Sequence, residues 1–394
     1  MITTLAFANY RSLRQLVLPL APLTVVTGAN GTGKSNVYRG LRLLASAASG
    51  GHRNGLIAGL ANEGGLQSVL FAGPEQGGAA LHKRGLPVQG TVRRDPVRVK
   101  LGFATAATEH TLGYALELGV PVPGALGPTA FALDPEIKYE SVFHGPLLRP
   151  AGTLVERTGP MARARQGRRW QVVAPSLSGH DSVLDSATDG GLAELDGVRR
   201  TLRSWRFYDH LRTDRDAPAR AAHIGTRTPV LSDSGSDLAA ALQTVIEIGD
   251  AEALHDAVDD AFPGASVSVT VDRGLFNLVL QRRGLLRPLA AAELSDGTLR
   301  YLMLLAALLS PRPPSLLVLN EPETSLHPDL MAPLARLISQ CPVQVLVVTH
   351  AAALVRALEA RADGTVLQLV TEQGETCVHG LHDLDAPPWR WPGG

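Results

Sequence analysis

The stretch TGANGTGKSN, residues 27–36, constrains the fold of this chain more than any other segment. Gly28, Gly33, Lys34 and Ser35 fill the pattern G-x-x-x-x-G-K-[ST] without a mismatch. An apolar run precedes the motif, and a helical pattern with one apolar face follows it. In such a strand, glycine-rich turn and helix, backbone N–H groups and the helix N-terminus together bind a phosphate. The segment therefore predicts a P-loop rather than an ordinary turn.

The motif also assigns roles to side chains. Lys34 is expected to reach the β- and γ-phosphates of a nucleotide, and the Ser35 hydroxyl is expected to bind Mg²⁺. The motif by itself leaves ATP and GTP open. The expected nucleotide-binding residues are Gly28, Ala29, Asn30, Gly31, Thr32, Gly33, Lys34, Ser35 and Asn36.

Composition bounds the class of protein. Lys and Arg number 37 and Asp and Glu 37, a balance that argues against wholesale coating of nucleic acid but permits local basic patches. The two cysteines, Cys341 and Cys377, make no disulfide framework and no zinc pair, which favours the reducing cytoplasm. The N-terminus lacks a secretion-signal layout, and no apolar run approaches about 18 residues. We therefore expect a cytoplasmic protein without a membrane partner.

The pattern along all 394 residues predicts a single α/β head made of four segments. Residues 1–50 hold the N-terminal strands and the P-loop. Residues 51–230 read as an insertion of antiparallel strands, followed by a helical pattern over 192–212. Two helices and a hairpin are expected over 231–290. Residues 291–394 return to alternating strands and helices, and no internal repeat or heptad pattern interrupts them.

Two apolar strands of the last segment end in polar residues. Asn320 and Glu321 directly follow SLLVL, and His350 directly follows VQVLVVT. The carboxyl end of a parallel strand is where an α/β sheet presents side chains to a ligand. Glu321 is placed to orient or deprotonate an attacking water, and Asn320 to face the Mg²⁺ shell. The three strand ends at Gly28, Asn320 and His350 thus predict one catalytic sheet edge.

A third motif precedes a strongly apolar helix. LSDGT places Ser295, Asp296, Gly297 and Thr298 at the helix start, where a hydroxyl and backbone N–H groups can bind an anion. By itself such a sequence is more often a turn and helix cap. Its significance comes from the motifs around it.

Together these motifs resemble those of the soluble RecF-like and SMC-like branch of ABC-type ATPases, a family also termed predicted AAA-type ATPases. GANGTGKS is similar to its Walker A motif, LSDGT to its signature, NEPETSLHP to its Walker B and D-loop, and VVTH to its switch histidine. The resemblance implies a P-loop NTPase with an ABC-type head, an antiparallel β insertion and a helical lobe. It also implies ATP and Mg²⁺ as cofactors, and a homodimer formed on ATP binding. In that dimer residues 295–298 would act in trans on the ATP of the other subunit.

The resemblance carries further residues with it and shows departures. Arg11 is the expected phosphate contact from NYRS, and Gln67 is the expected Q-loop metal ligand. Asn320 replaces the Asp that is usual in Walker B, and an amide holds a Mg²⁺-bound water more weakly than a carboxylate does. Because Glu321 and His350 are retained, we expect an ATPase that is slow rather than inactive.

Two functions remain open on the sequence. The first is a DNA-associated ATPase in repair, chromosome maintenance or defence, supported by the family and by basic runs at 91–100, 163–170 and 199–212. Trp170, Trp205, Phe207 and Tyr208 lie within or beside those runs, although such rings can also pack in the core of the helical lobe, which is the role we expect for Trp205 and Phe207. The second is an ATP-driven switch that gates a protein effector without touching DNA. A metabolic kinase fits poorly, because it has no use for the signature motif.

Overall fold

The computed structural model of the protein describes residues 1–50, 55–73, 97–106, 112–121, 129–186, 192–361, 364–381 and 385–392. The chain divides into two compact units. The first comprises Met1–Ala21, Gly28–Trp205 and Leu367–Gly394, and the second comprises Pro22–Thr27 and Arg206–Val366. This division differs from the four sequence segments, since residues 51–230 contribute to both units.

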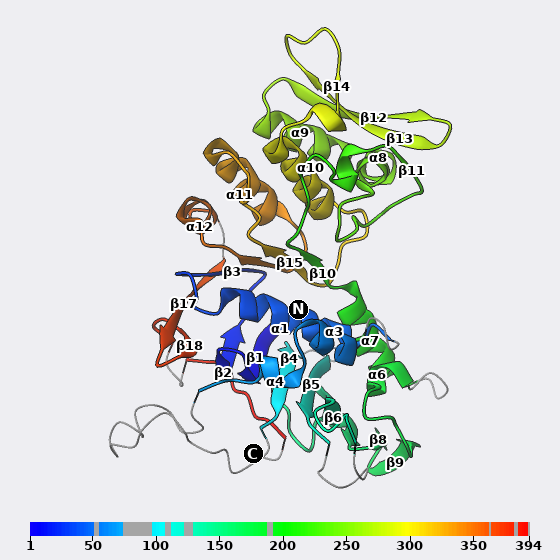
Figure 1. The fold of residues 1–394 in the computed structure, drawn as a ribbon, viewed down its shortest axis with the longest axis vertical. Helices are drawn as coiled ribbons and strands as arrows, with labels where there is room; N and C mark the ends of the chain where they lie inside the picture. The colour runs from blue at the N-terminus through cyan, green and yellow to red at the C-terminus, as the bar shows by residue number, and fades with distance from the viewer. Residues whose placement is uncertain are drawn as a thin grey trace. The chain divides into compact units, whose positions relative to one another are not determined.

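The first unit is built on an antiparallel sheet in the order β2-β1-β4-β5-β6-β7-β8-β9 (Figure 1). The predicted antiparallel insertion is therefore confirmed, and it extends a sheet that the N-terminal strand pair begins. The strands of this sheet are β1 (Ile2–Tyr10), β2 (Leu13–Pro19), β4 (Val99–Thr105), β5 (Leu112–Gly119), β6 (Glu136–His144), β7 (Thr153–Thr158), β8 (Met161–Gln166) and β9 (Arg169–Ala174). Most of the antiparallel pair β17 (Thr365–Glu372) and β18 (Glu375–Val378), which is not part of this sheet, also belongs to the first unit.

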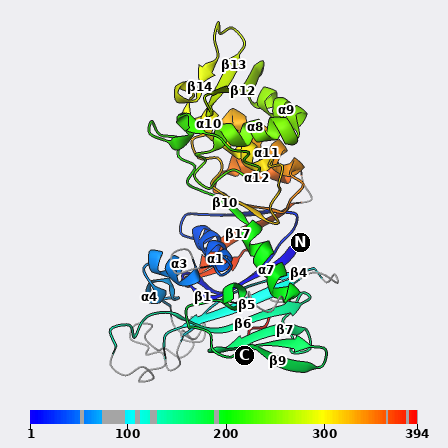
Figure 2. The ribbon, with the colours of Figure 1, turned by 90° about the vertical axis from the view of Figure 1, so that its right-hand side faces the viewer.

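Helices of this unit lie over one face of the sheet, as Figure 2 shows for α1 and α7. The helix after the P-loop, α1, contacts β1 and β4, and α7 contacts β5, β6 and β7. Gly40 of α1 lets the Phe7 ring approach, because a Cβ there would lie 2.7 Å from a Phe7 ring carbon. The helices are α1 (Lys34–Ser46), α3 (Leu56–Asn62), α4 (Leu66–Val69), α6 (Val183–Ser186) and α7 (Ala193–Ser204).

The second unit holds parallel strands in the order β10-β15-β16-β3. Apolar residues predominate in β3, β15 and β16, as expected for strands that are buried on both faces. Parallel pairing aligns Asn320 with Val348 at the carboxyl ends of β15 and β16. These strands are β3 (Leu23–Gly28), β10 (Arg206–Tyr208), β15 (Leu317–Asn320) and β16 (Val345–Val348).

Around this sheet the second unit carries helices and a smaller antiparallel sheet, β11-β13-β12 with β14 beside β13. The two helices and the hairpin that the sequence predicts over 231–290 are confirmed. The remaining elements are β11 (His223–Ile224), β12 (Ala265–Asp272), β13 (Leu275–Arg282), β14 (Leu289–Ala290), α8 (Leu238–Ile248), α9 (Ala251–Ala261), α10 (Asp296–Leu308), α11 (Met331–Gln340), α12 (Ala352–Glu359) and the short 3₁₀ turns η1 (Pro218–Arg220), η2 (Ala291–Glu293) and η3 (Pro328–Leu330).

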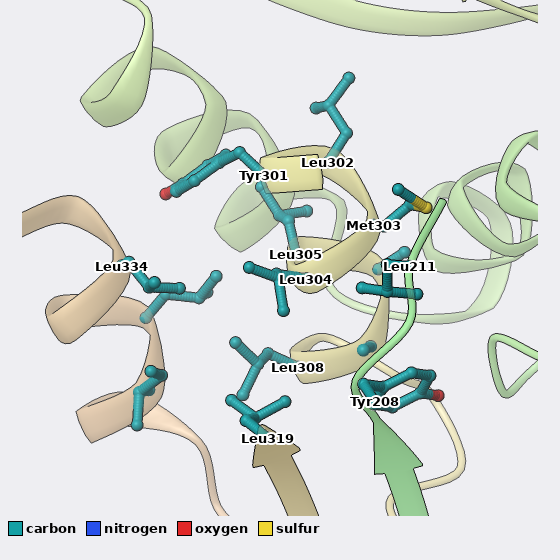
Figure 3. Close-up of a cluster of buried hydrophobic side chains, with 14 of the residues drawn as sticks. Tyr208, Leu211, Tyr301, Leu302, Met303, Leu304, Leu305, Leu308, Leu319 and Leu334 are labelled. Atoms are coloured by element: carbon teal, nitrogen blue, oxygen red, sulfur yellow. The ribbon is translucent and has the colours of Figure 1, made fainter. Parts of the chain in front are cut away.

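Helix α10 is the centre of the second core, since every residue from Thr298 to Leu308 is buried. Figure 3 shows its side chains against Leu334 of α11, Leu319 of β15 and Tyr208 of β10. A helix that is apolar on all of its faces is stable only when other elements pack against all of them. No helix in the described part of the chain is long and apolar enough to cross a membrane.

One sequence-based expectation is wrong. The helical pattern over 192–212 ends at Ser204, and the chain then forms the parallel strand β10. Trp205, Phe207 and Tyr208 are 3%, 7% and 2% exposed, so they belong to the core and not to a surface for DNA. The β-favouring aromatic side chains of Phe207 and Tyr208, and the pairing of these residues with β15, outweigh the helical spacing of the residues before them.

Candidate functional site

The P-loop lies in the first unit and closes around Lys34. The Lys34 Nζ donates to the carbonyl oxygens of Gly28 at 2.7 Å and Ala29 at 2.8 Å, and Lys34 is 7% exposed. Helix α1 begins at this lysine, so its first N–H groups and the ammonium share one end of the loop. Ala29, Asn30, Gly31 and Ser35 are exposed around it. A positively polarised, accessible loop of this kind fits a polyphosphate.

Two glycines of the loop are required by their surroundings. Gly28 has φ 149°, and a Cβ there would lie 2.4 Å from the Leu369 carbonyl oxygen. Gly33 has φ 96°, and a Cβ there would lie 2.2 Å from the Thr376 hydroxyl oxygen. Gly31 has φ 82° but faces open space. The cradle thus depends on glycine for its backbone angles and for close packing.

A hydroxyl network that the sequence did not predict supports the loop. The Ser12 and Thr376 hydroxyls lie 2.6 Å apart, and the Thr376 hydroxyl donates to the Thr32 carbonyl at 3.0 Å. The Asn36 amide donates to the Ser12 hydroxyl at 2.8 Å. Residues from the beginning and the end of the chain therefore hold the P-loop, and no motif in the sequence could have marked Thr376.

Arg11 and Gln67, the two positions carried over from the family resemblance, lie in the same unit. Arg11 has φ 53° and forms an ion pair with Glu63, with 2.7 Å between Nη2 and Oε2. Its backbone N–H donates to the Val69 carbonyl of α4, the helix that carries the exposed Gln67. Their contacts with phosphate and metal stay predictions.

In the second unit the structure brings Glu321 and His350 together. The two residues lie just after the carboxyl ends of the neighbouring strands β15 and β16, and the Glu321 N–H donates to the Val348 carbonyl at 2.8 Å. The His350 Nδ1 lies 3.4 Å from the Glu321 Oε1, and both side chains are about half exposed. Glu321 has φ 47°, a left-handed conformation that is strained for a residue with a Cβ. A carboxylate and an imidazole so placed can polarise and orient a water molecule.

Glu323 is a site residue that the sequence analysis missed. Its Oε1 accepts from the Thr349 hydroxyl at 2.5 Å and from the backbone N–H groups of His350 and Ala351, each at 3.3 Å. The same oxygen lies 3.6 Å from the His350 Nδ1. Glu323 is 8% exposed, and such burial of a carboxylate is costly unless it is hydrogen-bonded. Glu323 therefore holds the backbone of the turn that carries His350.

The signature segment caps α10. The Ser295 hydroxyl accepts from the Thr298 N–H at 3.2 Å and lies 2.8 Å from the Thr298 hydroxyl. A Cβ on Gly297 would lie 2.7 Å from the Ser325 carbonyl oxygen, so the signature and the D-loop are in close contact. The capping interpretation is thus confirmed, and the trans role of residues 295–298 stays a prediction.

Two arginines bind segments around α10, and neither was identified from the sequence. Arg300 is 5% exposed. Its guanidinium donates to the Leu211 carbonyl, from a segment before α10 in the chain, and to the Glu321 carbonyl at 3.0 Å, from a segment after it. Burial lowers the pKa of the Arg300 guanidinium. Arg220 donates to the Leu294 carbonyl at 2.7 Å and to the Asp296 carboxylate at 2.6 Å. A charged residue inside the apolar α10 pattern was the only sequence signal for Arg300.

Comparisons with known proteins agree with this arrangement. The family model described as "AAA domain, putative AbiEii toxin, Type IV TA system" matches residues 23–101 and 178–356, about two thirds of the chain. No curated protein is a significant match.

Among solved structures, an SMC head bound to the C-winged helix domain of ScpA is similar with a TM-score of 0.51 and 13% identity, covering 96% of this chain and 97% of that one. An SMC head with an extended coiled coil from Pyrococcus furiosus, bound to the C-terminal domain of ScpA, has a TM-score of 0.50 and 12% identity, covering 96% and 95%. An SMC head with a coiled coil and joint from Pyrococcus yayanosii has a TM-score of 0.50 and 11% identity, covering 97% of each chain. At 11–13% sequence identity, the similarity to these structures shows a shared fold and nothing more.

Proposed function

The chain belongs to the AAA-domain family named above and is a P-loop ATPase of the SMC-head type, and on that basis we propose that it hydrolyses ATP slowly, dimerises on ATP and acts on DNA. The observation that carries the catalytic part is the contact of Glu321 with His350 at the ends of parallel strands. The cytoplasm is the proposed compartment, because both cysteines are free.

Each site residue has a role in this proposal. Lys34 and the P-loop N–H groups hold the phosphates, and the Ser35 hydroxyl, Asn320 and Gln67 are the residues that would hold a Mg²⁺ ion. Such an ion would supply positive charge to offset the charge that develops on the phosphates. Glu321 orients a water and accepts its proton at the carboxylate.

His350 and Asn320 set the rate in different ways. His350 donates a hydrogen bond toward the terminal phosphate while Glu323 fixes its backbone. Asn320 offers a neutral amide oxygen where a carboxylate would bind the metal more strongly, and turnover is correspondingly slow.

Dimerisation is proposed from the family resemblance, with Ser295 and Gly297 completing the ATP site of the other subunit. Lys34→Ala and Ser295→Arg proteins should then each be inactive, whereas a mixture should regain activity. A mixed two-fold dimer has one site with both lesions and one with neither, so random mixing should restore about a quarter of the parent activity.

Sedimentation provides a second readout that does not depend on turnover. The Glu321→Gln protein should be a monomer without nucleotide and a dimer with ATP, because the bound γ-phosphate adds contacts to the second subunit. A protein that stays monomeric at saturating ATP, with concentration-independent activity per molecule, would rule out the shared sites.

The DNA-associated role competes with an ATP-driven switch that gates a protein effector. The second candidate is favoured by the similar SMC heads, which were solved in complex with domains of ScpA. A DNA titration with and without ATP at several salt concentrations separates the two. A DNA-binding protein should show a steep dependence on salt, and a slope near zero would favour the protein switch.

A further inference from the structure

The three basic runs differ in what their side chains contact. In the first run, residues 91–96 lie outside the described residues, and Arg98 and Lys100 both form ion pairs with Glu117. The run across α7 and β10 has its aromatic rings in the core. The run at 163–170 is different, because Arg163, Arg165 and Trp170 line one hollow in the surface.

The hairpin β8–β9 forms one wall of this hollow. Ala162 and Ala164 of β8 are buried, so the alternation of a strand puts Arg163 and Arg165 on the opposite face. Trp170 of β9 pairs with Arg165 in the strand register. The guanidinium carbons of Arg163 and Arg165 lie 4.8 and 5.7 Å from the centre of the Trp170 ring. The hairpin therefore presents a stack of two cations and one indole.

Residues 390–392, near the C-terminus, also line the hollow. Trp389 anchors them, since a Cβ on Gly102 would lie 2.6 Å from the Trp389 ring, and Phe143 contacts the same ring at 6.2 Å between centroids. Trp391 packs on Trp389 at 5.1 Å and, with Arg390, lines the hollow. The hollow has a volume of about 780 Å³, and all of its lining residues belong to the first unit.

Charge in the hollow is strongly positive. Its lining includes four arginines and one carboxylate, Glu156, which forms an ion pair with Arg163. The Arg165 Nη1 donates to the Ala151 carbonyl at 2.7 Å, which orients the guanidinium without neutralising it. Within the described ranges, no acidic side chain forms an ion pair with Arg149, Arg165 or Arg390. Three guanidinium charges are thus available to an anionic ligand.

We propose that this hollow binds single-stranded nucleic acid, with its phosphates on Arg149, Arg165 and Arg390 and its bases beside Trp170 and Trp391. Arginine forks match phosphate oxygens, and indole rings stack on bases whatever the sequence. A paired duplex keeps its bases stacked inside, so it offers only phosphates to such a site. An acidic peptide would use the arginines but gain little from the two indoles. The inference rests on the proposed DNA-associated function and names the surface that serves it.

The test is fluorescence anisotropy with a labelled oligothymidylate of about 20 nucleotides, long enough to span one site of this type. Each phosphate contact in single-stranded binding contributes about 0.7 to the slope of log affinity against log salt. The Arg149→Ala/Arg390→Ala protein should therefore lose about 1.4 from that slope and bind about 25-fold more weakly at 0.1 M salt. The matched control is Arg200→Ala/Arg312→Ala, which removes two exposed charges outside the hollow and should bind as the parent does.

Stacking is tested separately through the indole. Trp170→Ala should weaken binding about tenfold with the salt slope unchanged, and Trp170→Phe should restore most of the affinity. ATPase activity without DNA should be unchanged in all these proteins, which shows that they are folded.

The possible results distinguish a failure of the proposed binding site from a failure of the proposed DNA-associated function. Parent-like binding by both the double arginine variant and Trp170→Ala would overturn the site and leave the DNA-associated function standing. Equal competition by polyglutamate would overturn the nucleic-acid assignment in favour of an acidic peptide. If the parent protein bound neither the oligothymidylate nor a DNA duplex, with or without ATP, the DNA-associated function and this site would fail together.

Discussion

Replacement of Glu323 by glutamine tests whether the turn that carries the switch histidine is held by this buried carboxylate. The change keeps the shape of the side chain and one oxygen acceptor, and it removes the charge. The Glu323 Oε2 is buried and has no hydrogen-bond partner in the described structure, so the new amide nitrogen takes a place where no donor has to be displaced. The change therefore weakens the contacts of Oε1, and it also buries an amide NH₂ group for which the described structure shows no acceptor.

The magnitude follows from those contacts. The hydrogen bond from Thr349 at 2.5 Å is short, whereas the two from the backbone N–H groups at 3.3 Å are long. A hydrogen bond to a charged group contributes about 1.5–3 kcal/mol, roughly twice its neutral counterpart. Loss of the charge should thus cost about 1.4 kcal/mol, which is about a tenfold fall in kcat if the turn must be in place for hydrolysis. Glu323→Ala removes the acceptor altogether and should cost about 3 kcal/mol, or about 100-fold.

Single-turnover ATP hydrolysis and direct nucleotide binding form the assay, because they separate the chemical step from affinity. The expected result is a lower hydrolysis rate with ATP affinity unchanged. Thr349→Val should match Glu323→Gln, and Thr349→Ser, which keeps the hydroxyl, should retain the parent rate. Because Thr349 and Glu323 contact each other, the double variant should lose less than the sum of the single losses.

Three results would refute the reasoning. Glu323→Gln could hydrolyse ATP at the parent rate, which would show that the charge is not needed. ATP affinity could fall as much as the rate, which would place Glu323 in binding rather than in positioning. Thermal unfolding could shift by the whole 1.4 kcal/mol estimate with the rate per folded molecule unchanged, which would make the contact purely structural.

Further variants test the nucleotide site. Lys34→Ala should abolish ATP binding in a direct titration, since the phosphates lose their fixed cation, and near-normal affinity would contradict the P-loop assignment. Glu321→Gln should bind ATP but hydrolyse it far more slowly in a phosphate-release assay, and the parent rate would exclude Glu321 as the base. Asn320→Asp should lower the Mg²⁺ concentration needed for half-maximal activity, whereas an unchanged Mg²⁺ dependence would remove Asn320 from the metal shell. Gly33→Ala should lower ATP affinity and thermal stability more than Gly31→Ala, because both need positive φ but only at Gly33 would the new Cβ meet a side chain, at 2.2 Å.

Much of the fold was predictable from the sequence, because local patterns determine local elements. The P-loop and its helix, the hairpin over β12 and β13, and the strands ending at Asn320 and before His350 all form where periodicity and turn residues placed them. The boundary at Trp205 was not predictable in this way. Helical spacing continues past Ser204, and the partner that converts the next residues into β10 is a strand more than 100 residues away in the chain.

The sequence by itself determined the chemical groups of this protein, since the P-loop and the carboxylate at Glu321 are recognisable from contiguous residues. The tertiary structure alone decided which distant residues support them. Thr376 reaches the P-loop across more than 300 residues, and Glu323 reaches the turn at His350 from the turn that follows β15. The physical reason is that a motif requires a fixed spacing along one segment, whereas a supporting hydrogen bond requires only that folding bring a donor and an acceptor to about 3 Å of each other.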